Sequence, residues 1–165
     1  MILKSFEIEK IKIEGKNFFL FYGENQGYKS QVIKEKFENE FKESTYNYEE
    51  KEILKNKNNF FDNILSKSFF ENKKLIIINR VSDKFKDILD ELIEKKIEDL
   101  VLILNANILE KKSKIRSLFE KGKNTFCVPF YEDNNQTLAN IVSGYFRSKK
   151  IPISQQAINL IVGRA

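Results

Sequence analysis

The sequence predicts an α/β fold, in which a parallel sheet is flanked by helices and followed by the start of a small helical domain. Continuous apolar runs alternate with amphipathic segments of roughly ten to fifteen residues, a pattern typical of βαβ units. After Asp133 two helical patterns follow each other with no strand between them. We therefore expect a domain boundary near residues 131–136, with the first domain over residues 1–133 and the second over residues 134–165.

Short apolar runs predict the buried strands of the sheet. We expect strands at 17–22, 75–79, 100–105 and 125–128, and a weaker one near 45–48. Helical spacing of apolar residues predicts helices at 29–41, 60–70, 83–96, 111–120, 137–149 and 154–162. Apart from the weak strand, the polar segment 42–59 is expected to be a loop. Ser82 or Asp83 should cap the helix that begins there.

Composition excludes several classes of function. The 165 residues carry a net charge of +5, which permits anionic partners such as nucleic acid. The basic residues are interleaved with acidic ones, so the charge does not single out such a partner. With one cysteine, Cys127, and no histidine, the chain has no internal disulfide, no usual zinc site and no histidine base.

Charged residues run through the first ten positions, and no apolar run approaches the roughly 20 residues that span a bilayer. We therefore expect a cytoplasmic protein with no membrane partner.

The segment FYGENQGYKS at 21–30 lies between a predicted strand and a predicted helix, where a phosphate-binding P-loop belongs. The P-loop motif is G-x-x-x-x-G-K-[ST], and its second glycine lets the backbone wrap around the phosphates. Gly23, Lys29 and Ser30 match the motif. Tyr28 takes the place of the second glycine, and Gly27 lies one residue too early. A side chain at Tyr28 should obstruct or narrow the turn.

The residues that would complete a hydrolytic site are also missing. Asn79 and Arg80 follow the apolar run at 75–78, where a Mg²⁺-binding Asp and a catalytic Glu are needed. We interpret Gly23, Gly27, Lys29 and Ser30 as a degenerate nucleotide loop, and we expect no catalytic residue, metal or cofactor. The alternative interpretation of the segment is an ordinary strand-to-helix turn with a helix-capping role, which is nearly equivalent in function.

Two other classes of function stay open. The first is an active P-loop enzyme, which Tyr28 and the missing acids argue against. The second is a free-standing nucleic-acid-binding module that uses a basic run on one helix. That run consists of Lys111, Lys112, Lys114 and Arg116. Such runs are more often solvated helix faces.

Several segments, taken in order, resemble the delta subunit of bacterial DNA polymerase III. The resemblance covers essentially the whole chain, and its order and spacing carry more weight than any single motif. The matching segments are Phe21-Tyr22-Gly23-Glu24, Ser68-Phe69-Phe70, Lys73-Lys74-Leu75-Ile76-Ile77, Leu100-Val101-Leu102-Ile103-Leu104, Lys111-Lys112-Ser113-Lys114, Phe126-Cys127-Val128-Pro129-Phe130, Ile151-Pro152-Ile153-Ser154 and Ala157-Ile158-Asn159-Leu160-Ile161.

The resemblance implies an AAA+-like first domain and a truncated, lid-like second domain, with the C-terminal collar domain of the family absent. It further implies a clamp-loader subunit that binds and opens the sliding clamp during DNA replication without an ATPase activity of its own. Such a chain is a non-catalytic part of a nucleotidyltransferase complex, the DNA polymerase holoenzyme. Its expected partners are the sliding clamp (beta subunit), the delta prime and gamma/tau loader subunits, and DNA, weakly or through the complex.

The resemblance also places the clamp-binding residues at Leu65, Phe69 and Phe70. The family often has a further apolar residue two positions before this Phe pair, but Lys67 stands there. Alternatively Phe61, Leu65 and Phe69, spaced i, i+4, i+8, pack on the sheet. Neighbouring helical residues point about 100° apart, so one ring can pack inward while the other faces the clamp. We favour Phe70 as the exposed anchor.

Overall fold

The computed structural model describes residues 1–10, 13, 15, 17–42, 44–65, 73–95, 97 and 99–164. The chain divides into two compact units, Met1–Phe130 and Tyr131–Ala165, and each is described by itself. Within the described residues, no helix is both long enough and apolar enough to cross a membrane.

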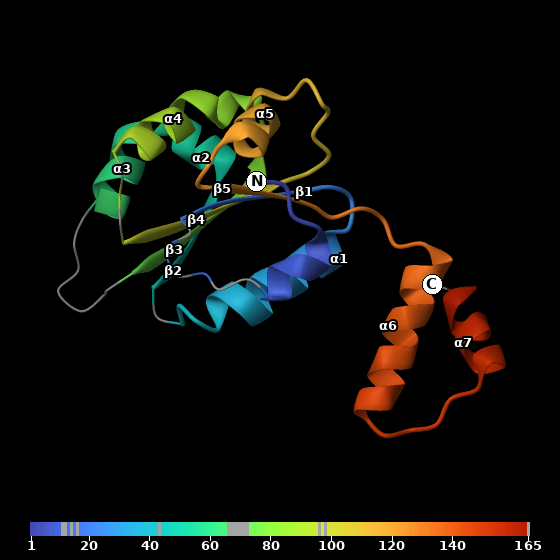
Figure 1. Cartoon of the computed structure of the whole chain (residues 1–165). Coiled ribbons are helices and arrows are strands. Elements are labelled where there is room, and N and C mark those ends of the chain that lie inside the picture. Colours follow the sequence, from blue (N-terminus) through green and yellow to red (C-terminus); the bar gives the residue numbers. More distant parts are fainter. Residues whose placement is uncertain are drawn as a thin grey trace. The chain divides into compact units, whose positions relative to one another are not determined.

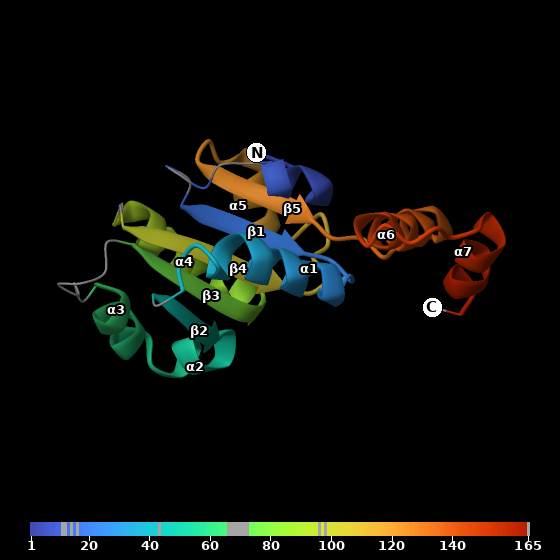
Figure 2. The ribbon, with the colours of Figure 1, turned by 90° about the horizontal axis from the view of Figure 1, so that it is seen from below.

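The first unit contains a five-stranded parallel sheet in the order β2-β3-β4-β1-β5. Figure 2 shows this order across the sheet. The strands are β1 (Phe18–Tyr22), β2 (Thr45–Glu49), β3 (Lys74–Val81), β4 (Leu100–Ala106) and β5 (Thr125–Pro129). All the expected strands are present, and the weak one is the edge strand β2. The predicted α/β fold is therefore confirmed.

Helices cover both faces of the sheet (Figure 1). One face carries α1 (Gln26–Val32), its π-helical continuation η2 (Ile33–Glu38) and the 3₁₀ helix η1 (Ser5–Lys10). The other face carries α2 (Glu50–Lys55), α3 (Lys57–Leu65), η3 (Asp83–Phe85), α4 (Lys86–Glu94) and α5 (Lys114–Lys121).

Strand residues alternate between the two helical layers because successive side chains of a strand point to opposite faces. Leu20 and Leu104 contribute to the core under α2–α5, whereas Phe19 and Ile103 contribute to the core under α1. Phe19 also contacts Phe37 edge-on, with ring centroids 5.0 Å apart. Each fully buried side chain of this kind contributes about 1.5–3 kcal/mol to folding.

The expected loop at 42–59 is wrong after the weak strand, because residues 50–59 form α2 and the start of α3. Glu49 and Glu52 form a capping box for α2. The Glu50 carboxylate accepts hydrogen bonds from the Ser82 N–H and hydroxyl at 2.7 and 3.0 Å. Helix α2 has six residues, and Ile53 is its buried apolar residue. The sequence therefore shows no apolar periodicity there.

Other boundaries move because caps decide where a helix begins. The helix expected at 29–41 begins at Gln26, after the Asn25 cap, and changes to π-helical turns at Ile33. The basic helix begins at Lys114 rather than Lys111, because Ser113 caps it. The helix expected at 60–70 begins at Lys57, and its last five positions lie outside the described residues.

The second unit contains the two expected helices, α6 (Asn135–Ser148) and α7 (Gln155–Val162). Asn134 and Thr137 form a capping box at the start of α6, and the Ser154 hydroxyl caps α7. Ile158 is buried in this unit, while Tyr145 and Leu160 are each 60% exposed.

Candidate functional site

The segment between β1 and α1 lies at the carboxyl end of the sheet, directly against the end of β5. Gly23 has a φ of +122°, and a β-carbon there would lie 2.2 Å from the Phe130 carbonyl oxygen. Only glycine fits this close approach. The Asn25 N–H donates to the same carbonyl at 3.2 Å. The first glycine of the motif is therefore required by packing against β5.

Backbone N–H groups hold the phosphates in a working P-loop. Here several of these groups already donate to acceptors inside the protein. They are the N–H groups of Gly23 to the Asn107 carbonyl (3.1 Å), Asn25 to the Phe130 carbonyl (3.2 Å), Gln26 to the Glu24 carbonyl (2.8 Å) and Tyr28 to the Asn25 side chain (3.0 Å). These N–H groups are therefore already bonded to acceptors of the protein, in the loop itself and in the segments after β4 and β5.

Lys29, which matches the phosphate-binding lysine of the motif, points into the protein. Its side chain is fully buried, and its Nζ donates to the carbonyls of Gly23 at 3.0 Å and Ala106 at 2.6 Å. Burial lowers the pKa of this amine to about 8. In this arrangement the ammonium bonds to the protein backbone, where a P-loop lysine would bond to phosphate.

The remaining loop residues have ordinary structural roles. Gly27 lies within α1 at a helical φ, where an added β-carbon would meet only the Asn25 side chain, at 3.8 Å. The Tyr28 ring lies edge-on to Phe130 with centroids 5.4 Å apart. Ser30 is exposed on α1. Contacts of Lys29 and of the Phe130 backbone thus close the loop, and the obstruction of the turn by Tyr28 stays a prediction.

The amide of Asn79 and the guanidinium of Arg80 occupy the positions where carboxylates would bind Mg²⁺ and activate water. The Asn105 side chain of β4 donates to the Asn79 side chain of β3 at 3.0 Å. Arg80, with a φ of +57°, turns outward and pairs with Glu49 at 3.1 Å. Within the part of the chain that the structure describes, no group of three or more His, Cys, Asp or Glu could hold a metal ion. Burial raises the pKa of Cys127 to about 12, so this thiol is not a ready nucleophile.

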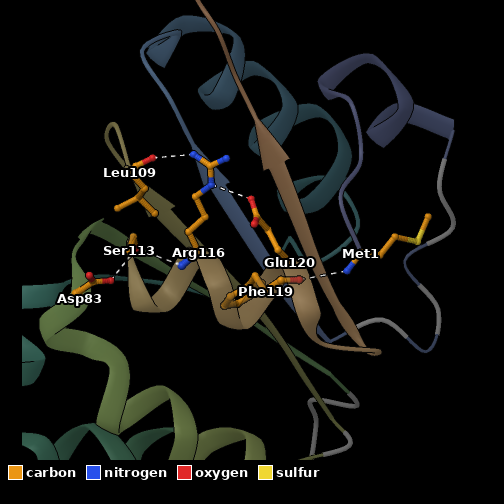
Figure 3. A network of polar contacts seen from close by, with 7 residues as sticks. All are labelled: Met1, Asp83, Leu109, Ser113, Arg116, Phe119 and Glu120. Carbon is orange, nitrogen blue, oxygen red and sulfur yellow. Dashed lines mark hydrogen bonds and ion pairs between the residues drawn. The ribbon is translucent and has the colours of Figure 1, made fainter. Parts of the chain in front are cut away.

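Helix α5, which follows the β4 end, is held by polar contacts that the sequence did not reveal (Figure 3). The Asp83 carboxylate accepts from the Ser113 hydroxyl at 2.7 Å and from the Ile115 N–H at 3.0 Å, at the start of the helix. The Met1 ammonium donates to the Phe119 carbonyl at 3.2 Å, near its end. Negative charge at the start of a helix and positive charge at its end both favour the helix dipole.

Arg116 is used within the protein. Its Nε donates to Glu120 at 2.8 Å, its Nη1 donates to the Leu109 carbonyl at 3.0 Å, and its guanidinium lies 4.9 Å from the Tyr22 ring centroid. The hydrogen bond to Glu120 raises the pKa of Arg116. In the basic run that left a nucleic-acid-binding module open as an alternative, Arg116 therefore packs on α5, while Lys111, Lys112 and Lys114 are exposed.

Comparison with known proteins gives this arrangement its family. A family model for the DNA polymerase III delta subunit matches residues 19–143. The chain belongs to the DNA polymerase III delta subunit family. No curated protein matches the chain.

Two solved structures show which folds the delta-family chain resembles. The Bacillus subtilis DNA clamp loader delta protein is similar, with a TM-score of 0.64, 16% identity, 96% of this chain covered and 51% of that one. The delta-family chain thus spans about half the length of that protein. Domain III of the Thermotoga maritima replication initiation protein DnaA is matched with a TM-score of 0.45 and 12% identity, over 96% of this chain and 72% of that one. The predicted membership of the delta family and the AAA+-like fold are confirmed.

The clamp-binding residues predicted for the delta-family chain are described in part. Leu65 ends α3 and is 43% exposed, whereas Phe61 and Ile64 of the same helix are buried. Leu65 is therefore not part of a core stripe with Phe61. Phe69 and Phe70 lie outside the described residues. Their role as anchors stays a prediction.

Proposed function

We propose that this chain is the part of a clamp-loader delta subunit that binds and opens the sliding clamp, and that it hydrolyses no ATP itself. Its membership of the delta family over residues 19–143 carries the proposal. The cytoplasm, where DNA replication takes place in bacteria, is its proposed location. Its proposed partners are the sliding clamp (beta subunit), the delta prime and gamma/tau subunits, and DNA through the assembled loader.

Two features of the sheet edge support the absence of hydrolysis. ATP hydrolysis needs a cation on the phosphates and carboxylates that hold Mg²⁺ and position water. The Lys29 ammonium is buried on two backbone carbonyls, and Asn79 pairs with Asn105 where acids would stand. An amide is a weaker Mg²⁺ ligand than a carboxylate and cannot act as a general base at neutral pH. We infer that the energy for loading comes from other subunits.

The exposed end of α3 supports a clamp-binding surface. Leu65 leaves a large apolar side chain partly in water at the last described position of the helix, and it precedes Phe69 by four positions in the sequence. Apolar and aromatic anchors of this kind account for much of the binding energy in protein interfaces. We propose that the three residues form one anchor for a hydrophobic pocket on the clamp.

Titration calorimetry tests both halves of the proposal. The chain is titrated with the cognate sliding clamp, and separately with ATP and Mg²⁺. We expect saturable binding of the clamp and no heat from the nucleotide. The clamp half is wrong if no binding is seen at clamp concentrations of about 100 μM. Any binding would then be weaker than a Kd of about 100 μM, which corresponds to about 5.5 kcal/mol of binding free energy. The nucleotide half is wrong if ATP binds in the micromolar range.

A further inference from the structure

The end of β1 and the end of β4 are joined by several hydrogen bonds that involve no ligand. Lys29 Nζ contacts the Gly23 carbonyl after β1 and the Ala106 carbonyl at the end of β4. The Gly23 N–H donates to the Asn107 carbonyl at 3.1 Å, and the Gln26 side chain donates to the Asn107 side chain at 2.9 Å. These contacts bring together segments that lie about 80 residues apart in the chain, as the separation of 77 between Lys29 and Ala106 shows.

Lys29 is the buried charged residue of this set. Burying an ammonium costs several kcal/mol unless hydrogen bonds replace its water, so the two carbonyls hold the Lys29 side chain in place. Carbonyls that have lost such a donor are themselves unfavourable when buried. The contact therefore stabilises one arrangement of the loop and the β4 end together.

The segment that follows β4 continues this connection to α5. The Leu109 carbonyl, two residues beyond Asn107, accepts from Arg116, whose guanidinium also lies on the ring of Tyr22. Tyr22 is the last residue of β1 and directly precedes Gly23. The 106–109 segment thus contacts Lys29 at Ala106 and α5 at Leu109.

We propose that Lys29 is an internal latch, a positioning residue whose ammonium holds the ends of β1 and β4 together in place of a bound phosphate. In a P-loop the equivalent lysine reaches the β- and γ-phosphates. Here its acceptors belong to the chain, so the edge of the sheet keeps one geometry with no nucleotide. The latch is independent of clamp binding, and it shares with the proposed function only the absence of nucleotide from this loop.

Amide hydrogen exchange of Lys29→Met tests the latch, with Lys34→Met, an exposed lysine next along the same helical segment, as the matched control. We expect exchange to become about tenfold faster or more in residues 23–30 and 104–110, as local opening predicts, and to change little in β2. Lys34→Met should leave all three segments unchanged. The latch is refuted if exchange in Lys29→Met rises equally throughout the first unit, or does not rise near the loop.

A measurement on the unmodified chain keeps the test decisive if Lys29→Met fails to fold. Assigned nitrogen-15 spectra of labelled lysine should show a Lys29 side-chain signal whose protons exchange with water far more slowly than those of the exposed lysines. A set of uniformly fast lysine signals would overturn the latch.

Adding ATP and Mg²⁺ to the unmodified chain separates the two proposals. Protection of residues 23–30 from exchange by the nucleotide would contradict the proposed absence of ATP binding. The comparison of Lys29→Met with the unmodified chain, made without nucleotide, tests the latch alone.

Discussion

The Nζ atom of Lys29 lies 2.6 Å from the carbonyl oxygen of Ala106 and donates a hydrogen bond to it. This bond joins the first turn of α1 to the end of the central strand β4. A lysine at the phosphate-binding position of the motif thus belongs to the protein interior, and two of the predictions below concern the segments it joins.

Lys29 should make stability depend on pH in the alkaline range. Burial lowers the pKa of this amine from 10.5 to about 8, so the folded chain binds its proton less tightly than the unfolded chain does. The cost of burying the charge is therefore present below pH 8 and is relieved as the pH rises toward 10.5. We expect the unfolding free energy of the unmodified chain, minus that of Lys29→Met, to increase between pH 8 and 10. Urea unfolding at several pH values measures it, and parallel curves for the two chains would contradict it.

Two glycine substitutions in the loop should have opposite effects. Gly23→Ala places a β-carbon 2.2 Å from the Phe130 carbonyl oxygen at a φ of +122°, and should cost more than about 2 kcal/mol of stability. Gly27→Ala lies in α1, where the added β-carbon makes only an ordinary contact with the Asn25 side chain at 3.8 Å, and it should be neutral or stabilising by up to about 1 kcal/mol. Chemical denaturation of both variants provides the comparison. Equal stabilities would show that the loop does not close against β5 as described.

Asp83→Ala should remove the acceptor at the start of α5. Burial acts to raise the Asp83 pKa, but hydrogen bonds from Ile115 and Ser113 hold it below its usual value. Such a carboxylate stabilises the folded chain above its unfolded pKa, and this contribution is lost as the pH falls through the folded value. We expect a loss of roughly 0.5–2 kcal/mol at pH 7, the size of a helix cap. The exposed Asp62→Ala serves as control, and a difference that persists undiminished at pH 2 would argue against the charge.

Truncation of the predicted anchors should weaken clamp binding without unfolding the chain. Phe70→Ala should reduce the binding free energy by more than about 1 kcal/mol, with little change in thermal stability. Leu65→Ala should act in the same direction, whereas Leu54→Ala, a leucine of similar exposure on α2, should not. Calorimetry with the clamp and thermal unfolding are read together for each variant.

The stability measurement distinguishes an anchor from a core residue. If Phe70 packs in the core, its truncation should cost about 3–5 kcal/mol of stability, and the loss of binding would follow from unfolding. A double variant Phe69→Ala and Phe70→Ala that stays folded and binds the clamp normally would remove the site assignment. The proposal of clamp binding would then depend on family membership alone.

The sequence by itself determined the layered α/β fold and the defects of the nucleotide loop. Apolar runs such as 100–104 are long enough to identify buried strands without any knowledge of their neighbours. Tyr28 and Asn79 identify a loop that lacks parts of the P-loop, because the motif depends on residue types at fixed local spacing. The helix α2 escaped prediction, since a six-residue helix with one buried apolar residue has no readable period.

Only the tertiary structure decided where the lysine of the motif points and what holds α5. The partners of Lys29 and Asp83 lie 77 and 30 residues away, respectively, at Ala106 and Ser113, and a main-chain carbonyl carries no signature in the sequence. Local spacing predicts that a helix exists and which face is apolar, but the acceptor of a buried ammonium depends on how distant strands pair. For this reason the same Lys-Ser pair can bind a phosphate in one protein, while in this one its lysine binds a carbonyl of the neighbouring strand.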